Sequence, residues 1–268
     1  MARVKGMQTI VGGFANASFY TIQGGDPVYV RIKGGPSKRA IKTKHQFEKL
    51  RRNNSEWTAC TKMGSLIRYA YFEMKQLEDY PVIGSLNALT KKIQFLDEEG
   101  EHGKRSILLS KHKDLLGGFS LSRKQVLESV LRVPIQATID RENKSARVVI
   151  PAIDTKLYLY NFRNLPYFRL YFQLGGVSDW SYSAVNKEYA PLHEAYWDEN
   201  RIFISDWFFT NGTIEPIDKQ LTYYDELEVI PEGITLLLTV GLEFGKPGTD
   251  GKPERVKYAG CGKILRVG

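Results

Sequence analysis

The sequence predicts an α+β protein with a basic N-terminal β arm at residues 1–42, a short helical region at 43–132 and a C-terminal antiparallel β-sandwich at 133–268. Three observations lead to this prediction. Glycine pairs interrupt short β-like runs near the start, and apolar residues recur at helical spacing in the middle. After that, runs rich in Val, Ile, Tyr and Phe alternate with turn residues. A chain of 268 residues can bury a sizeable core without disulfides.

The β arm is predicted from a strict alternation of side chains. Val28, Val30 and Ile32 point one way, while Tyr29 and Arg31 point the other, which is typical of a half-buried strand. A ribbon of two or three strands is marginal in isolation. We therefore expect the arm to pack on its own chain or to add to the sheet edge of a neighbouring subunit.

Helices are expected after the arm. Thr43, followed three residues later by Gln46, resembles a capping box and predicts the start of the first helix. Apolar residues at three- and four-residue steps over 57–74 predict a helix that ends near Pro81, and the same spacing over 82–96 predicts a second one. Two antiparallel helices are the expected result.

The remainder of the chain predicts mostly strands. A less regular helical stretch is expected over 122–131, before Pro134 favours an extended conformation. Turn residues then separate the runs expected to form strands, which are 135–139, 148–150, 156–160, 167–172, 201–209, 221–229, 234–242 and 256–265. Seven or eight such strands suit an antiparallel sandwich.

Composition narrows the class of protein. Two cysteines, Cys60 and Cys261, are too few for a disulfide framework, and we expect both to be buried as small apolar residues. The first thirteen residues lack the apolar core of a signal peptide, and no run approaches the roughly 18 apolar residues of a membrane span. We therefore expect a cytoplasmic protein with no membrane partner.

Positive charge is concentrated at the start of the chain. Residues 1–65 contain 12 Lys and Arg against 3 Asp and Glu, a net charge of +9. Residues 179–243 contain 3 Lys and Arg against 13 Asp and Glu, a net charge of −10. Such a basic segment can contact phosphates, an anionic surface or an acidic protein face. The third use is notable here because a complementary segment belongs to the same chain.

The leading hypothesis is a non-enzymatic structural protein that forms homo-oligomers or filaments, because a heterologous contact between copies repeats into a ring or filament. The predicted arm residues are Arg31, Lys33, Lys38, Arg39, Lys42, Lys44, Arg51 and Arg52. The predicted acidic face contains Asp198, Glu199, Asp225, Glu226 and Glu228. The alternative is a nucleic-acid-binding protein that uses the same basic residues without sequence preference. Solvated surface charge, with no partner, is the simplest explanation.

No motif predicts catalytic residues, a cofactor or a metal site. His193 and Glu194 begin like a zinc-protease helix, but Trp197 stands where the second histidine is needed. The glycine pairs spell neither of the two common phosphate-binding loops, and no small-molecule substrate is evident. An enzyme acting on a carbohydrate, with two carboxylates in a sandwich cleft, remains a third hypothesis.

The opening of the chain resembles a group of bacterial proteins of unknown function. The residues that carry this resemblance are Gly12-Gly13, Ser18-Phe19-Tyr20, Val28-Tyr29-Val30-Arg31, Gly34-Gly35, Phe47, Arg51, Asn53, Glu56 and Trp57. They cover about the first quarter of the chain and are not specific for any reaction. The resemblance implies no catalytic residues, and it implies that the basic β arm and the helix after it form a recurring unit.

Overall fold

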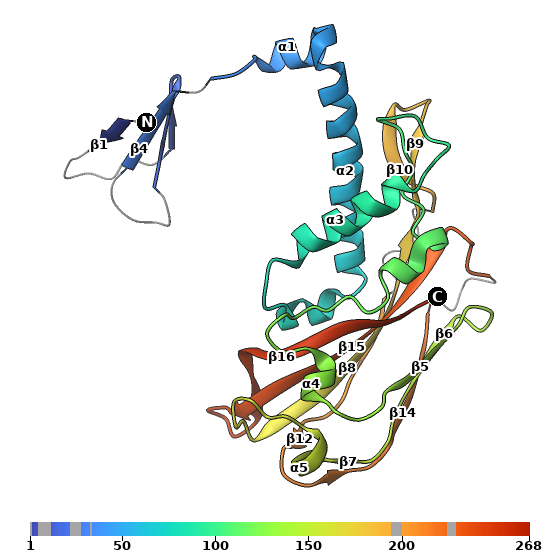
Figure 1. Cartoon of the computed structure of the whole chain (residues 1–268). Coiled ribbons are helices and arrows are strands. Elements are labelled where there is room, and N and C mark those ends of the chain that lie inside the picture. The colour runs from blue at the N-terminus through green and yellow to red at the C-terminus, as the bar shows by residue number, and fades with distance from the viewer. Residues whose placement is uncertain (1, 5–11, 22–27, 33, 194–199, 224–228) are drawn as a thin grey trace. The chain divides into compact units, whose positions relative to one another are not determined.

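The computed structural model describes residues 2–4, 12–21, 28–32, 34–193, 200–223 and 229–268 (Figure 1). These residues form two compact units, 1–51 and 52–268, which are described separately. The helices are α1 (Lys38–Thr43), α2 (Glu48–Tyr69), α3 (Val82–Phe95), α4 (Leu127–Val130) and α5 (Thr155–Tyr158), with 3-10 helices η1 (His45–Phe47), η2 (Phe72–Leu77) and η3 (Ser110–Leu115). The strands are β1 (Ala2–Val4), β2 (Gly12–Phe14), β3 (Ala17–Tyr20), β4 (Val28–Ile32), β5 (Gln136–Asp140), β6 (Ser145–Ile150), β7 (Ile153–Asp154), β8 (Tyr167–Ser178), β9 (Trp180–Ser183), β10 (Glu188–Pro191), β11 (Arg201–Ile204), β12 (Phe208–Phe209), β13 (Thr213–Ile214), β14 (Ile217–Thr222), β15 (Ile234–Pro247) and β16 (Pro253–Val267).

The first unit contains an antiparallel sheet with the strand order β1-β4-β3-β2. A two-residue turn joins β2 to β3, and its Ala15 adopts φ 48°, the left-handed conformation that such tight hairpins require. The predicted β arm is therefore a four-stranded sheet of short strands.

Helix α1 follows the sheet, and its start corrects the predicted one. The Ser37 side chain accepts a hydrogen bond from the Ala40 N–H at 3.1 Å and caps the helix. Thr43 was predicted to cap the first helix, but it is the last residue of α1, where its hydroxyl donates to the Arg39 carbonyl at 2.9 Å. The capping-box prediction was wrong because Ser37, directly after Pro36, offers a cap six residues earlier.

The second unit confirms the α+β class with a β-rich C-terminal part. Strands β11, β8, β15 and β16 form an antiparallel sheet in that order, and β12 also pairs with β8. Strands β14, β6 and β5 form a second antiparallel sheet. One continuous core contains side chains of both sheets, including Val148 and Ile150 of β6 and Phe168, Leu170 and Phe172 of β8. The two sheets therefore pack face to face, as expected of a sandwich.

A layer of helices covers the other face of the larger sheet (Figure 1). Tyr171 and Val177 of β8 and Leu237 of β15 belong to a second core, together with Met63 and Ile67 of α2. Strands β8 and β15 are therefore buried on both faces, which explains their long, nearly continuous apolar runs. The sequence did not reveal this third layer, because a strand covered on both sides loses the alternation that marks its faces.

Glycines allow the helical layer to approach the sheet closely. A Cβ atom on Gly175 of β8 would lie 2.3 Å from the carbonyl oxygen of Ala70. A Cβ atom on Gly241 of β15 would lie 2.5 Å from a methyl group of Leu77, and one on Gly260 of β16 would lie 2.6 Å from the other. The end of α2 and the helix η2 thus rest directly on the sheet backbone.

Several predicted boundaries need correction. Helix α2 ends at Tyr69, and η2 rather than a continued α-helix leads toward Pro81. Only residues 127–130 of the stretch 122–131 are helical. The predicted strand 156–160 begins instead as helix α5, because the side chain of Asp154 accepts a hydrogen bond from the Lys156 N–H and caps a helical turn.

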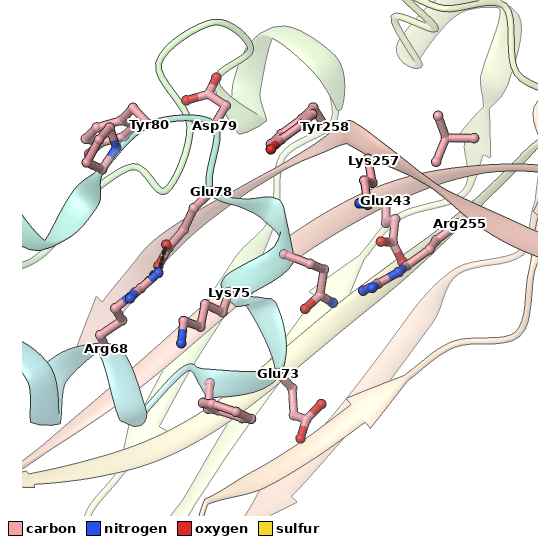
Figure 2. A pocket seen from close by; sticks show the side chains of 14 residues that line it. Arg68, Glu73, Lys75, Glu78, Asp79, Tyr80, Glu243, Arg255, Lys257 and Tyr258 are labelled. Carbon is pink, nitrogen blue, oxygen red and sulfur yellow. Dashed lines mark hydrogen bonds and ion pairs between the residues drawn. The ribbon is translucent and has the colours of Figure 1, made fainter. Parts of the chain in front are cut away.

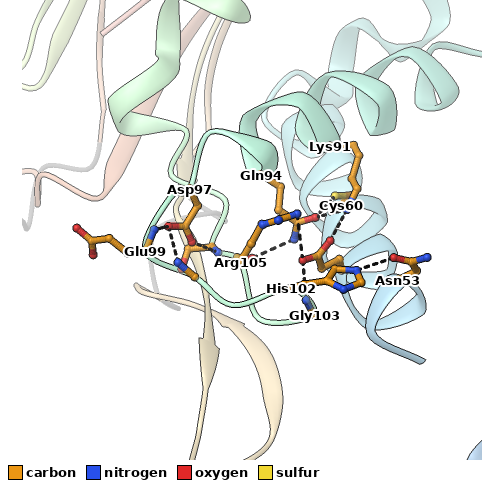
Figure 3. A network of polar contacts seen from close by, with 12 residues as sticks. Asn53, Cys60, Lys91, Gln94, Asp97, Glu99, His102, Gly103 and Arg105 are labelled. Carbon is orange, nitrogen blue, oxygen red and sulfur yellow. Dashed lines mark hydrogen bonds and ion pairs between the residues drawn. The ribbon is translucent and has the colours of Figure 1, made fainter. Parts of the chain in front are cut away.

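A buried polar network fastens α2 to α3 and to the loop after it (Figure 3). The Glu56 carboxylate, 1 % exposed, accepts hydrogen bonds from Lys91 Nζ at 2.6 Å and from the Gly103 N–H at 2.8 Å. Burial would raise the pKa of Glu56, but these hydrogen bonds and the charges of Lys91 and Arg105 outweigh burial and lower it. Gln94 joins the network by donating to the Arg105 carbonyl at 3.0 Å.

The contacts between α2 and α3 run in opposite order along the two helices. Glu56 meets Lys91, the Cys60 carbonyl accepts from Thr90, and Gly64 lies against Asn87 farther along. The predicted antiparallel arrangement of these two helices is confirmed.

Replacing Gly175 with alanine should destabilise the protein by about 2 kcal/mol, because the new methyl group meets the backbone of Ala70 and the helical layer must shift. Urea denaturation measures this change. Gly34→Ala is the matched control, since no atom lies within 4 Å of a Cβ at that position. Equal stability of the two variants would contradict the close packing of α2 on β8.

Glu56→Gln should lower the free energy of unfolding by about 2 kcal/mol near neutral pH, because Lys91 loses its charged acceptor. The pKa of Glu56 is lower in the folded protein than its ordinary value of 4.5, so its stabilising charge is present above that pH and is lost as the pH falls below it. Unfolding measured between about pH 7 and pH 3 should show the wild type losing more stability than the variant. Parallel pH profiles would refute this role of Glu56.

Candidate functional site

Seven of the eight predicted arm residues lie in the described part of the chain, and Lys33 lies outside it. Six of the seven are exposed. Five of these six belong to the first unit, and they are Arg31 on β4, Lys38, Arg39 and Lys42 on α1, and Lys44 directly after α1. They form the basic surface of the first unit.

Arg51 is partly buried and serves the fold of the first unit. Its guanidinium donates to the carbonyl oxygens of Ile41 at 2.7 Å and Lys44 at 2.9 Å, which ties the end of α1 to α2. Arg52 is exposed, and its Cβ and Cγ atoms would each lie 2.8 Å from a Cβ atom on Gly103. The structure thus distinguishes Arg51 from the exposed cations, which sequence alone could not do.

All five residues of the predicted acidic face, Asp198, Glu199, Asp225, Glu226 and Glu228, lie outside the described residues. Three other acidic residues of the segment 179–243 have partners within the chain. Asp179 accepts from the Ser110 N–H at 2.9 Å, Asp218 pairs with Arg147, and Glu243 pairs with Arg169. Burial raises the pKa of Asp179, although its hydrogen bonds with Ser110 oppose that shift. Part of the net charge of −10 counted over residues 179–243 is therefore already compensated within the chain, and less of it remains to attract a partner.

The N-terminal sheet has two chemically different faces. Residues that pair directly across strands share a face, and the pairs Ala17–Ile32 and Phe19–Val30 place apolar side chains together. The apolar face consists of Phe14, Ala17, Phe19, Val28, Val30 and Ile32. Phe14 is 78 % exposed and Ile32 is 77 % exposed. Large apolar side chains gathered at such exposure are typical of an interaction surface.

The opposite face of the same sheet is polar and carries charge. It presents Ser18, Tyr20, Tyr29 and Arg31, and the rings of Tyr20 and Tyr29 stack with their centroids 5.9 Å apart. The sequence predicted the alternation in β4. It did not reveal that β2 and β3 contribute to the same apolar face, because that depends on the register between strands.

A cleft of about 650 Å³ lies in the second unit between η2 and strand β16 (Figure 2). We call it the η2 cleft, and it is lined by Arg68, Phe72, Glu73, Lys75, Gln76, Glu78, Asp79, Tyr80, Pro81, Glu243, Arg255, Val256, Lys257 and Tyr258. Charged side chains of both signs and several aromatic rings meet here. None of these residues was predicted to form a site, because they come from residues 68–81 and from the β15–β16 hairpin, which are far apart in the sequence.

Two similar groups of side chains, each an Arg, a Glu and a Tyr, line or support the η2 cleft. In the first, the Arg68 Nε donates to Glu78 at 2.8 Å, and the Tyr71 hydroxyl donates to the same carboxylate at 3.4 Å. Burial raises the pKa of the Tyr71 hydroxyl, and the neighbouring Glu78 charge raises it further.

In the second group, Arg169 donates to the buried Glu243 carboxylate at 2.8 Å, and the Tyr171 hydroxyl also donates to it. The Arg169 guanidinium lies 4.5 Å from the centre of the Trp207 ring, an additional cation–π contact. Burial and Glu243 together raise the pKa of the Tyr171 hydroxyl. Each carboxylate is already bound by an arginine and a tyrosine, so both groups serve to hold the wall of the cleft.

Among the described residues, no three His, Cys, Asp or Glu side chains lie close enough together to hold a metal ion. Within the same residues, no helix has the length and apolar character needed to cross a membrane. Comparison of the chain with family models, with curated proteins and with solved structures finds no match in any of the three. The functional argument therefore depends on the chain's own surfaces.

Proposed function

We propose that this protein is a non-enzymatic structural protein that forms homo-oligomers or filaments, in which the N-terminal sheet of one copy docks on the β-rich part of another. The observation that supports this proposal most strongly is the apolar face of that sheet, with Phe14 and Ile32 more than three-quarters exposed. Burying two such side chains at an interface gains about 1.5 to 3 kcal/mol each.

The surroundings of the apolar face favour a protein partner that carries negative charge. Residues 1–51 contain 10 Lys and Arg against 2 Asp and Glu, so the net charge of this unit is +8, the same as the net charge of the whole chain. The segment 179–243 has a sequence charge of −10, and five of its acidic residues belong to the acidic face predicted above. A contact between unlike surfaces of two copies is heterologous, and its repetition gives a ring or a filament.

Two free thiols support a cytoplasmic setting for this assembly. Cys60 and Cys261 are both buried and unpaired, and burial raises the pKa of the Cys60 thiol to about 11. Neither thiol is therefore primed to form a disulfide or to act as a nucleophile at neutral pH.

Nucleic acid is the alternative partner, and the two faces of the sheet separate the hypotheses. A phosphate backbone would contact Arg31 and the cations of α1, and it would leave the apolar face uncovered. Docking on a protein uses apolar and basic surface together. Substitutions on the apolar face therefore discriminate between the two partners.

The double variant Phe14→Ser/Ile32→Thr should weaken self-association roughly 100-fold, because the contact loses most of its apolar burial. Sedimentation velocity and negative-stain electron microscopy of nuclease-treated protein measure the change. Leu115→Ser is the control, since Leu115 of η3 is an exposed apolar residue, 47 % exposed, outside both the N-terminal sheet and the segment 179–243. A wild type that remains monomeric at high concentration, or a double variant that assembles normally, would exclude this mode of assembly.

Reversing three cations of α1, in Lys38→Glu/Arg39→Glu/Lys42→Glu, should weaken assembly at low salt and have less effect at high salt, because exposed charges are screened. Mixing this variant with Asp225→Lys/Glu226→Lys/Glu228→Lys should restore association between the two, which light scattering can follow. Failure of the mixture to associate, with each variant folded, would remove the predicted acidic face from the proposal. Loss of nucleic-acid binding with unchanged assembly would favour the alternative.

A further inference from the structure

A large bulge interrupts the pairing of β15 with β16 beside the η2 cleft. Glu243 pairs with Gly260 and Gly245 pairs with Arg255, so four residues of β16 stand opposite the single residue Phe244. Residues 256–258 of this bulge line the cleft together with Arg255. Bulges of this kind redirect side chains and are frequent beside functional sites.

Tyr258 occupies a strained position within the bulge. Its φ is +57°, a left-handed conformation that bulky residues rarely adopt, and its side chain is 67 % exposed. A glycine would take this conformation without strain, and an exposed ring contributes little to the core. Strain of this kind is concentrated at sites of ligand contact, so the outlier leads to a functional hypothesis.

Two clefts meet at Tyr258. A second cleft of about 420 Å³ is lined by Lys124, Phe162, Arg163 and other residues, and it shares Asp79 and Tyr258 with the η2 cleft. Tyr258 thus lines two neighbouring clefts. Such an arrangement suits a ligand with more than one unit that passes across the ring.

The free charges around this ring are mainly positive. Arg68 with Glu78 and Arg169 with Glu243 are neutral pairs. Four cations of the two clefts form no ion pair with any described residue, and these are Lys75, Arg255, Lys257 and Lys124. The carboxylate of Glu73, which also lines the η2 cleft, likewise forms no ion pair with a described residue.

The second carboxylate near Tyr258 belongs to Asp79, which lines both clefts and accepts hydrogen bonds from the backbone. Asp79 accepts hydrogen bonds from the N–H groups of Arg123 and Lys124, both at 2.8 Å. These neutral donors hold the Asp79 carboxylate in place without cancelling its charge. The four cations named above still outnumber the carboxylates of Glu73 and Asp79, so the surroundings of Tyr258 favour an anion.

We propose that the two clefts bind nucleotide units, with a base stacked on Tyr258 and phosphate groups held by Arg255, Lys257 and the neighbouring lysines. An exposed aromatic ring between cations is the arrangement by which proteins bind nucleotides in single strands without sequence preference. Arginine is well suited to phosphate because its guanidinium donates several hydrogen bonds from one plane. None of the residues that line the two clefts belongs to the N-terminal sheet or to the predicted acidic face.

Fluorescence anisotropy of the full-length protein at low salt tests the site with two probes, a labelled oligothymidylate of about 12 nucleotides and a labelled ADP. Tyr258→Ala and Arg255→Glu/Lys257→Glu should each weaken binding of the oligonucleotide roughly 10-fold or more. Lys111→Glu, an exposed cation on η3, is the matched control and should bind like the wild type. Tighter binding of the oligonucleotide than of ADP identifies a strand as the ligand, and equal affinity identifies a free nucleotide.

Tyr258→Gly guards against loss of binding through misfolding. It should weaken binding as Tyr258→Ala does while leaving the melting temperature at or above that of the wild type, because glycine relieves the strained φ. Absence of binding by both probes would overturn the proposal. Binding that is lost only when the charges of Lys38, Arg39 and Lys42 are reversed would also overturn it, because the ligand would then bind the first unit. Binding that survives in Tyr258→Ala but is abolished by dextran sulfate would overturn it as well, because such binding depends on charge alone. Sedimentation of the Tyr258 variants reports assembly separately, so failure of one proposal does not decide the other.

Discussion

The pairing of β8 with β15 is the constraint on which the second unit depends. Twelve residue pairs, from Ile234–Ser178 to Gly245–Tyr167, keep one register without a break. Because side chains alternate along each strand, this register sends Phe168, Leu170 and Phe172 into one core and Tyr171 and Val177 into the other. A slip of one residue would exchange the two cores, so the apolar contents of both layers specify the same pairing.

The η2 cleft is a consequence of how the helical layer rests on that sheet. Leu77 of η2 packs on Gly241 and Gly260, where a side chain on the strand would push the helix away. Gly260 directly follows the bulge of β16, so regular pairing ends where the glycine contact ends. Helix η2 packs closely on the sheet at Gly260, whereas the bulge of β16 before Gly260 departs from regular pairing. The η2 cleft lies between this bulge and η2. The buried groups Arg68–Glu78–Tyr71 and Arg169–Glu243–Tyr171 hold the walls of this cleft with hydrogen bonds to charged carboxylates.

The N-terminal sheet follows the opposite principle. Among the residues of β2, β3 and β4 only Val28 is buried, while Phe14 and Ile32 remain largely exposed. Small sheets gain stability when a second layer covers an apolar face. The β8–β15 sheet has such a layer on each side within its own unit, whereas Phe14 and Ile32 on the apolar face of the N-terminal sheet keep more than three-quarters of their surface exposed. Its basic opposite face and the cations of α1 then bias which partners it can meet.

The sequence by itself determined the α+β class, the alternation of β4, the antiparallel helices α2 and α3, and most strands of the β-rich part. These follow from local periodicity, which neighbouring residues encode. It mispredicted Thr43 as a cap and 156–160 as a strand, because Ser37 and Asp154 supplied stronger capping oxygens nearby. Only the tertiary structure decided that Arg51 braces the first unit, and that Tyr258, in a strained conformation, lines the same cleft as Asp79. The first outcome depends on how the chain turns between α1 and α2, which brings the carbonyls of Ile41 and Lys44 to the Arg51 guanidinium. The second depends on the irregular pairing of β15 with β16 and on packing between segments more than 150 residues apart, such as those of Asp79 and Tyr258, about which local sequence carries no signal.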